Sequence, residues 1–255
     1  VYVTQVVYDG KCYGGVLNSF YVGQGPVFLP ATPALKVQAD YPALWRGVAY
    51  DYYSGRGWSR EVTTTIELER DADGWFVVVG AERAVGERNR QVVTILSNEP
   101  RAIYGAARPV MVRMTEQGRR QTRMDYIPTV DAYGTLLTSF TQTPGVQWEV
   151  ISVMPPDDPA TLRATSPDYS EHIVRHYIEQ MELQAQVELG PIVAEVTAGA
   201  QTPYDKAAAI RAFLGSTCLY TTRAPAVPRG EDAAAYFVTS ERRGACDLFA
   251  TSMAV

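Results

Sequence analysis

The feature that most constrains the fold of this chain is a change in the period of its apolar residues near residue 155. Before this point, short segments rich in Val, Thr, Tyr and Trp alternate between apolar and polar positions, which is typical of strands. After it, apolar residues recur at intervals of three and four, which is typical of helices. The proline-containing stretch 154–159 separates the two patterns and disfavours helix. We therefore expect an α+β chain with a domain boundary near 155–165.

The segment 31–155 is predicted to be an all-β domain, following an extended, loosely packed N-terminal segment 1–30. Turn signals such as Ser54-Gly55 and Asp73-Gly74 separate its short strands. The candidate strands are 34–40, 45–53, 62–69, 75–79, 90–97, 109–114, 122–127, 135–140 and 146–154. Their spacing predicts an antiparallel sandwich or barrel-like domain.

Two groups of side chains in this domain have both a structural and a binding interpretation. Asp71 and Asp73 can ligate a cation, but two carboxylates before a glycine are typical of a solvated hairpin turn, which we favour. The stretch YPALWRGVAYDYYSGRGW, residues 41–58, gathers aromatic and arginine side chains that suit a carbohydrate or peptide platform. A core strand pair around a tight turn at 54–57 explains the same stretch, and we favour that interpretation.

The segment 165–255 is predicted to begin with helices. Candidate helices cover residues 171–183, 190–197, 203–214 and 231–238, and a short strand covers 218–222. The third helix has the clearest signals, because Thr202 can cap it, Pro203 suits its first position and Gly215 can close it.

The last residues of the chain contain a candidate nucleophile, Cys246. Gly244 is expected to free the backbone just before a helix that starts at Cys246. The sulfur would then lie in the first helical turn, where unpaired amide groups and the positive end of the helix dipole favour a thiolate. Arg242 and Arg243 add positive charge nearby. From these residues alone, a buried structural cysteine is the commoner alternative.

A thiolate nucleophile needs a base, which is normally a histidine. His172 and His176 are the two histidines of the chain, and they share one helical face at i and i+4. This spacing can bind a metal, but no third ligand accompanies it. We therefore expect no metal and no cofactor.

Composition excludes some broad classes of function. Hydrophobic residues make up 46% and charged residues 20%, which is the balance of a globular protein. A formal net charge of −5 argues against nucleic acid as a partner. The sequence contains no apolar run of the ~18 residues that a membrane span needs, so we expect no membrane contact by this chain itself.

The C-terminal third resembles the transglutaminase-like superfamily, in particular its bacterial membrane-anchored branch. Matching pieces occur in order: TPYDKAAAIRAFL (202–214), LYTT (219–222), AYF (235–237) and RRGACDLFATSMAV (242–255). In that family the element G-x-C-x-x-F-A carries the nucleophile, which here is Cys246. The resemblance extends over about 70 residues, and the aromatic stretch is similar to the β region that precedes the catalytic domain in this branch.

The resemblance implies the helical N-terminal part of a papain-like catalytic domain. The parent would be a cysteine acyltransferase, amidase or peptidase that forms a thioester with a protein or peptide substrate. In the family the catalytic His and Asp follow on later strands, here expected beyond Val255, while His172 and His176 match no catalytic position. The chain is accordingly expected to be truncated and inactive, with an uncovered C-terminal helix face that favours self-association. One departure is Ala245, where the family often has an aromatic residue.

The resemblance also implies an extracytoplasmic location, at the cell surface or in the periplasm, with the parent tethered to the cytoplasmic membrane. A second hypothesis is a non-catalytic cell-envelope module, in which the β domain recognises peptide or glycan and the C-terminal part is a scaffold.

Overall fold

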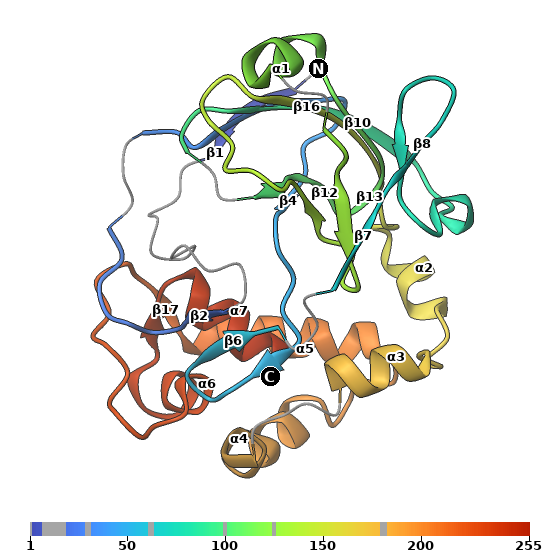
Figure 1. Ribbon diagram of the computed structural model, residues 1–255. Coiled ribbons are helices and arrows are strands. Elements are labelled where there is room, and N and C mark those ends of the chain that lie inside the picture. The colour runs from blue at the N-terminus through green and yellow to red at the C-terminus, as the bar shows by residue number, and fades with distance from the viewer. Residues whose placement is uncertain are drawn as a thin grey trace. The chain divides into compact units, whose positions relative to one another are not determined.

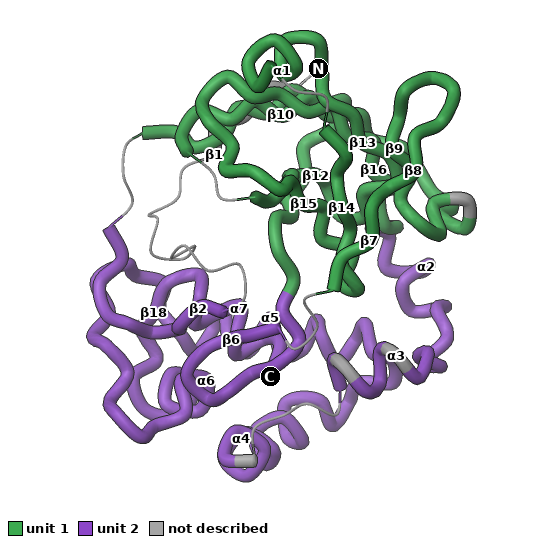
Figure 2. The backbone as a smooth tube through the Cα atoms, viewed as in Figure 1, with its two compact units in different colours: residues 1–17, 29–49, 62–156 green, residues 18–28, 50–61, 157–255 purple. Residues whose placement is uncertain are grey.

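The computed structural model describes residues 2–6, 19–28, 32–60, 64–98, 101–123, 126–178 and 183–255. Figure 1 shows a chain of helices and mainly antiparallel strands, which confirms the expected α+β class. The chain forms two compact units, coloured separately in Figure 2. Unit 1 contains residues 1–17, 29–49 and 62–156, and unit 2 contains residues 18–28, 50–61 and 157–255.

The strands are β1 (Tyr2–Val6), β2 (Ser19–Tyr21), β3 (Leu35–Ala39), β4 (Trp45–Arg46), β5 (Tyr52–Tyr53), β6 (Gly57–Ser59), β7 (Thr65–Glu67), β8 (Glu69–Arg70), β9 (Phe76–Val77), β10 (Arg88–Ile95), β11 (Ala102–Ile103), β12 (Gly105–Ala106), β13 (Arg108–Met114), β14 (Thr129–Asp131), β15 (Leu136–Leu137), β16 (Gln147–Val153), β17 (Leu219–Tyr220) and β18 (Arg243–Gly244). The helices are α1 (Glu116–Thr122), α2 (Pro159–Ala164), α3 (Glu171–Ile173), α4 (Leu183–Val196), α5 (Pro203–Thr217), α6 (Ala233–Tyr236) and α7 (Cys246–Ala254), with a 3-10 turn η1 (Ala81–Arg83) and π-helical segments η2 (Val174–Ile178) and η3 (Phe237–Glu241).

Unit 1 is built on a sheet of order β1-β3-β10-β16-β13-β9-β8, and a second sheet has the order β11-β15-β14-β7. Alternate residues of β10 are buried, as the period of two predicts. Side chains of both sheets form one apolar cluster around Trp148, which is 0% exposed. This is the arrangement of a sandwich, in which each sheet buries one face against the other.

The segment 1–30 differs from the expected loose N-terminal segment where it is described. β1 pairs along its whole length with β3, so its alternating pattern completes an edge of the large sheet. β2 pairs with β6 in unit 2, and the next residue, Val22, is 0% exposed. Both pairings satisfy backbone groups that a loose segment would leave to water. Residues 7–18, including Cys12, lie outside the described part.

The two units also differ from the expected division at 155–165. Residues 18–28 and 50–61 belong to unit 2, so the change of period marks only the last of several crossings between the units. Tyr53 and Trp58 explain this membership, because they join the apolar cluster of the helices. Short strands carry no local signal that distinguishes one core from another.

One predicted strand in unit 1 is wrong, because α1 occupies the beginning of the range 122–127. Thr115 caps this helix, accepting a hydrogen bond from the Gly118 amide at 3.1 Å. The helix ends at Arg123, which has a left-handed backbone with φ of 56°. The hydrogen bonds that cap the helix therefore outweigh the local β pattern. Residues 124–125 of the predicted strand lie outside the described part.

Unit 2 confirms the helix that Thr202 was predicted to cap. The Thr202 hydroxyl accepts a hydrogen bond from the Asp205 amide at 3.1 Å, and α5 continues through Gly215 to Thr217. The boundary predicted at residue 190 is wrong, because Pro191 lies inside α4. α4 buries Ala185 and Leu189 in the unit 2 core, and this packing overrides the local Gly-Pro signal.

An apolar cleft of about 620 Å³ opens in unit 2 between α4, α5 and the end of α7. Val193, Phe213 and Val255 are among its lining residues. The self-association expected of an uncovered helix face stays a prediction. Within the described ranges, no helix has both the length and the apolar character needed to cross a bilayer.

Candidate functional site

Cys246 is the first residue of α7, as predicted, and its side chain is exposed. The preceding residue, Ala245, is extended and buried, and its side chain makes no capping hydrogen bond. The opposite face of α7 is anchored in the core by Leu248, which is 4% exposed. The helix therefore presents the thiol to solvent from a rigid base, which is the reverse of a buried structural cysteine.

The backbone reaches Cys246 through a left-handed residue and a tightly packed glycine. Arg242, with φ of 54°, ends η3 and donates its amide to the Phe237 carbonyl at 2.8 Å. Gly244 is needed for space, because a Cβ there would lie 2.9 Å from Phe237 Cε2 and 2.8 Å from Leu248 Cδ1. Gly244 was expected to provide the unusual backbone conformation before the helix, but Arg242 is the residue that adopts it.

Tyr220 is a neighbour of the thiol that the site prediction did not single out. β17 and β18 pair in parallel, and the Thr221 amide donates to the Gly244 carbonyl at 2.8 Å. The Tyr220 ring lies 5.9 Å from the ring of Phe249 on α7. Burial raises the pKa of Tyr220, and the charge of Cys246 and a hydrogen bond to its side chain raise it further. The LYTT piece of the family resemblance was the available signal for this residue.

Asp247, in the first turn of α7, holds a segment distant in sequence. Its Oδ2 accepts a hydrogen bond from the Gly23 amide at 2.9 Å. Gly23 has φ of 63°, and a Cβ there would lie 2.5 Å from Val227 Cγ2. The segment after β2 is thereby fixed against α7, a contact that no local pattern could reveal.

The two arginines before Cys246 both have partners, and only Arg243 is paired with a carboxylate, so their effect on the thiol stays a prediction. Arg243 forms an ion pair with Glu241 at 2.5 Å, and Arg242 Nε donates to the Val238 carbonyl at 3.3 Å. The charge of Arg242 also acts on Cys218. Burial raises the pKa of the Cys218 thiol, and the smaller effect of Arg242 lowers it.

The second half of the aromatic stretch forms a core strand pair around a turn, and this pair contacts α7. β5 and β6 pair around this turn, and the Ser54 amide donates to the Gly57 carbonyl at 3.0 Å. Trp58 Nε1 donates to Thr251 Oγ1 of α7 at 3.0 Å. The favoured interpretation is confirmed for residues 52–58, whereas Trp45 and Arg46 form β4, which pairs with β12 in unit 1.

Tyr53 connects this strand pair to α6. Its hydroxyl donates to the Gly55 carbonyl at 3.1 Å and contacts Asp232 Oδ1 at 3.2 Å, and it accepts from the Ala234 amide at 3.1 Å. Asp232 also caps α6 by accepting from the Ala235 amide at 2.8 Å. Burial raises the pKa of Tyr53 far above its ordinary value, so the hydroxyl remains protonated.

The backbones of His172 and His176 lie in α3 and η2, and their side chains are outside the described part. Neither a catalytic nor a metal-binding role is tested for them. Among the side chains that are described, no group of three or more His, Cys, Asp or Glu residues is placed to hold a metal ion.

An exposed thiol at the first residue of a core-anchored helix, beside an aromatic hydroxyl, defines a candidate thiol-enzyme site. Residues 191–255 match the family model of the transglutaminase-like superfamily. The predicted resemblance is thereby confirmed.

The fold is similar to two crystal structures of the periplasmic domain of TgpA from Pseudomonas aeruginosa. The structure bound to ethylmercury has a TM-score of 0.57 and 16% identity, covering 88% of this chain and 71% of that one. The other has a TM-score of 0.57 and 15% identity, covering 93% and 74%. At these identities the similarity describes the fold alone. No curated protein matches the chain.

Proposed function

We propose that Cys246 is the nucleophile of a transglutaminase-like acyl-transfer reaction on glutamine or peptide amides. The observation that carries this proposal is the exposed thiol at the first residue of α7, inside the segment that matches the family. Unpaired amide groups in a first helical turn favour negative charge at such a position.

The reaction follows from the chemistry of a thiolate and an amide. The sulfur attacks the carbonyl carbon and forms a tetrahedral oxyanion. This collapses to a thioester when the nitrogen takes up a proton and leaves, as ammonia from a glutamine carboxamide or as an amine from a peptide bond. A primary amine or water then attacks the thioester and restores the thiol. Tyr220, whose raised pKa keeps its hydroxyl protonated, supplies a hydrogen-bond donor beside the sulfur.

The proton transfers require a base, and we place it outside residues 1–255 on the strength of the family resemblance. The 255-residue chain is then unable to turn over carboxamides, because protonation of the leaving amine is the base's task and contributes about 10²–10⁴-fold in rate. His172 and His176 are the alternative within the chain.

We further propose that the protein works outside the cytoplasm, with a membrane tether in the parent. The periplasmic origin of the structurally similar TgpA domain supports this location. A protein or peptide of the cell envelope is the substrate class that fits it.

An ammonia-release assay tests the proposal with a glutamine-containing peptide and a primary amine. It compares a longer natural form of the protein that has a histidine after Val255 with its Cys246→Ala variant and with the 255-residue chain. We expect turnover in the longer form alone. Peptide binding without ammonia release in the longer form would instead support the non-catalytic envelope module. Cys246-dependent turnover in the 255-residue chain would place the base at His172 or His176.

A further inference from the structure

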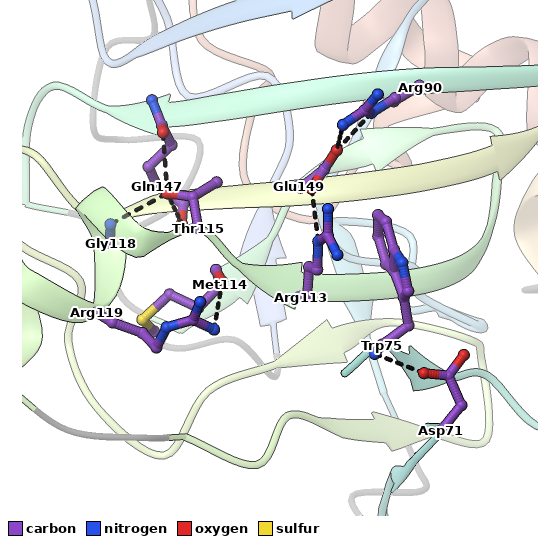
Figure 3. A network of polar contacts seen from close by, with 10 residues as sticks. All are labelled: Asp71, Trp75, Arg90, Arg113, Met114, Thr115, Gly118, Arg119, Gln147 and Glu149. Carbon is purple, nitrogen blue, oxygen red and sulfur yellow. Dashed lines mark hydrogen bonds and ion pairs between the residues drawn. The ribbon is translucent and has the colours of Figure 1, made fainter. Parts of the chain in front are cut away.

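Unit 1 contains an open polar cleft of about 650 Å³, on elements that the proposed reaction does not use. Its walls come from the β8–β9 hairpin, β13, β16 and the beginning of α1, and Figure 3 shows much of its lining. Three arginines line it, namely Arg70, Arg113 and Arg119.

The floor of the cleft is a carboxylate held between two arginines. Glu149 is 4% exposed and contacts Arg90 through Oε1 and Arg113 Nε through Oε2, the latter at 2.6 Å (Figure 3). Arg113 stands directly across from Glu149 in the pairing of β13 with β16. Both carboxylate oxygens are thus occupied, and the buried charge is neutralised.

Arg113 is fixed in orientation while part of its guanidinium remains available. Its Nε points at Glu149, and its guanidinium carbon lies 4.1 Å from the centre of the Trp75 ring. Its two terminal nitrogens make no hydrogen bond to the described residues. A guanidinium held in this way presents a preorganised pair of donors.

The hairpin that carries Trp75 is held by Asp71. Asp71 Oδ1 accepts hydrogen bonds from the Asp73 amide at 3.0 Å and the Trp75 amide at 2.8 Å. The favoured interpretation of these aspartates as a hairpin turn is confirmed. The turn fixes the aromatic surface on which Arg113 lies.

Arg119 faces the cleft from α1 and is also anchored. Its Nη1 donates to the Met114 carbonyl at 3.1 Å. α1 itself is pressed against β16, because a Cβ on Gly118 would lie 2.4 Å from the Gln147 carbonyl oxygen. The Thr115 hydroxyl bonds Gln147 Oε1 at 2.9 Å and completes the attachment.

The charge of the group around Glu149 favours a singly charged anion. The lining itself is balanced, because three arginines face the carboxylates of Asp73, Glu116 and Glu149. Around Glu149, however, Arg90 and Arg113 face one carboxylate, so this group has a surplus of one positive charge. This surplus occurs in a chain whose net charge is −5. The acidic side chains oppose a doubly charged phosphate more than a carboxylate, and arginine forks match the planar carboxylate.

We propose that this cleft binds a carboxylate, carried by the C-terminus of a peptide or by an acidic sugar. Arg113 and Arg119 supply the donors, and the Trp75 ring holds the guanidinium of Arg113 in place. The site is separate from Cys246, so it gives the β domain a recognition role that does not depend on the proposed catalysis.

Isothermal titration of the 255-residue chain tests the proposal with N-acetyl-diglycine, its C-terminal amide, glucuronate and inorganic phosphate. We expect at least one of the two carboxylates to bind at one site and to weaken with added salt, while the amide does not bind. Which of the two binds more tightly identifies the source. Failure of both carboxylates, equal binding of the amide, or tighter binding of phosphate would overturn the proposal.

Matched variants on one helix identify the site. Arg119→Gln should weaken carboxylate binding about tenfold, since it removes a charged donor. Arg120→Gln makes the same charge change outside the cleft lining. Its ion pair with the lining Glu116 is 3.6 Å long and joins side chains that are 83% and 80% exposed, and such pairs contribute little, so binding should stay within about twofold. Equal weakening by both variants would show a diffuse charge effect and refute the site. Cys246→Ala should leave binding unchanged even if the proposed catalysis fails.

Discussion

At the scale of single residues, the two described cysteines differ in environment. Cys246 is exposed at a helix start, whereas Cys218 is partly buried with a raised pKa because burial disfavours its thiolate. The sequence identified Cys246 through its place before an apolar helical run. It could not reveal that Arg243 is paired with Glu241, since that contact depends on the end of η3.

We predict that iodoacetamide alkylates Cys246 roughly tenfold faster than Cys218 at pH 6.5, because access and thiolate content control the rate. Since burial raises the pKa of Cys218, its alkylation rate should increase only at pH values above the ordinary pKa of a thiol. The difference between the two alkylation rates should therefore narrow at high pH. Peptide mass spectrometry after timed quenching measures both rates. Faster labelling of Cys218 in the folded chain would contradict the assignment.

Two glycines should respond to alanine in opposite directions. Gly244→Ala places a Cβ within 3 Å of Phe237 and Leu248, so we expect a loss of about 1–3 kcal/mol in the free energy of unfolding. Gly215 lies inside α5, where an added Cβ would meet nothing within 4 Å, so Gly215→Ala should gain about 0.5–1 kcal/mol. Urea denaturation measures both. Gly244→Ala with unchanged stability would show that the site tolerates movement of α7.

At the scale of elements, the capping of helices could be predicted from the sequence, whereas their tertiary packing could not. Thr202 signalled α5 because its side chain bonds the helix's own amide. The continuity of α4 through Pro191 depends on a core that the local sequence does not describe. The attachment of β5 to α6 through Tyr53 joins residues 179 positions apart, beyond any local pattern.

The attachment of β5 to α6 predicts that the loss of one oxygen atom lowers the free energy of unfolding. Tyr53→Phe removes the hydroxyl that contacts Asp232 and accepts from the Ala234 amide, leaving buried polar groups unsatisfied, so the loss should be about 1–3 kcal/mol. Tyr52→Phe is the matched control, because Tyr52 is 39% exposed and should change stability by less than about 0.5 kcal/mol. Thermal and urea unfolding compare the two. Equal effects of both variants would argue against the buried network.

At the scale of the whole molecule, the sequence predicted the α+β class, the sandwich and the family of the C-terminal segment. It did not predict that residues 18–28 and 50–61 join unit 2, because strands of two or three residues carry no long-range information. The same limit hid the arginine cleft, whose lining comes from β8 and the turn after it, β13, β16 and α1. The two proposed sites thus depend on contacts between distant segments.

The most direct test of the central claim is acylation of the 255-residue chain by p-nitrophenyl acetate. Its leaving group departs without a proton, so the reaction needs the nucleophile but no general base. We predict a stoichiometric burst of p-nitrophenol and an acetyl group on Cys246 by mass spectrometry, lost in Cys246→Ser and kept in Cys218→Ser. Acylation at another residue, or an undiminished burst in Cys246→Ser, would contradict the assignment of Cys246 as the nucleophile.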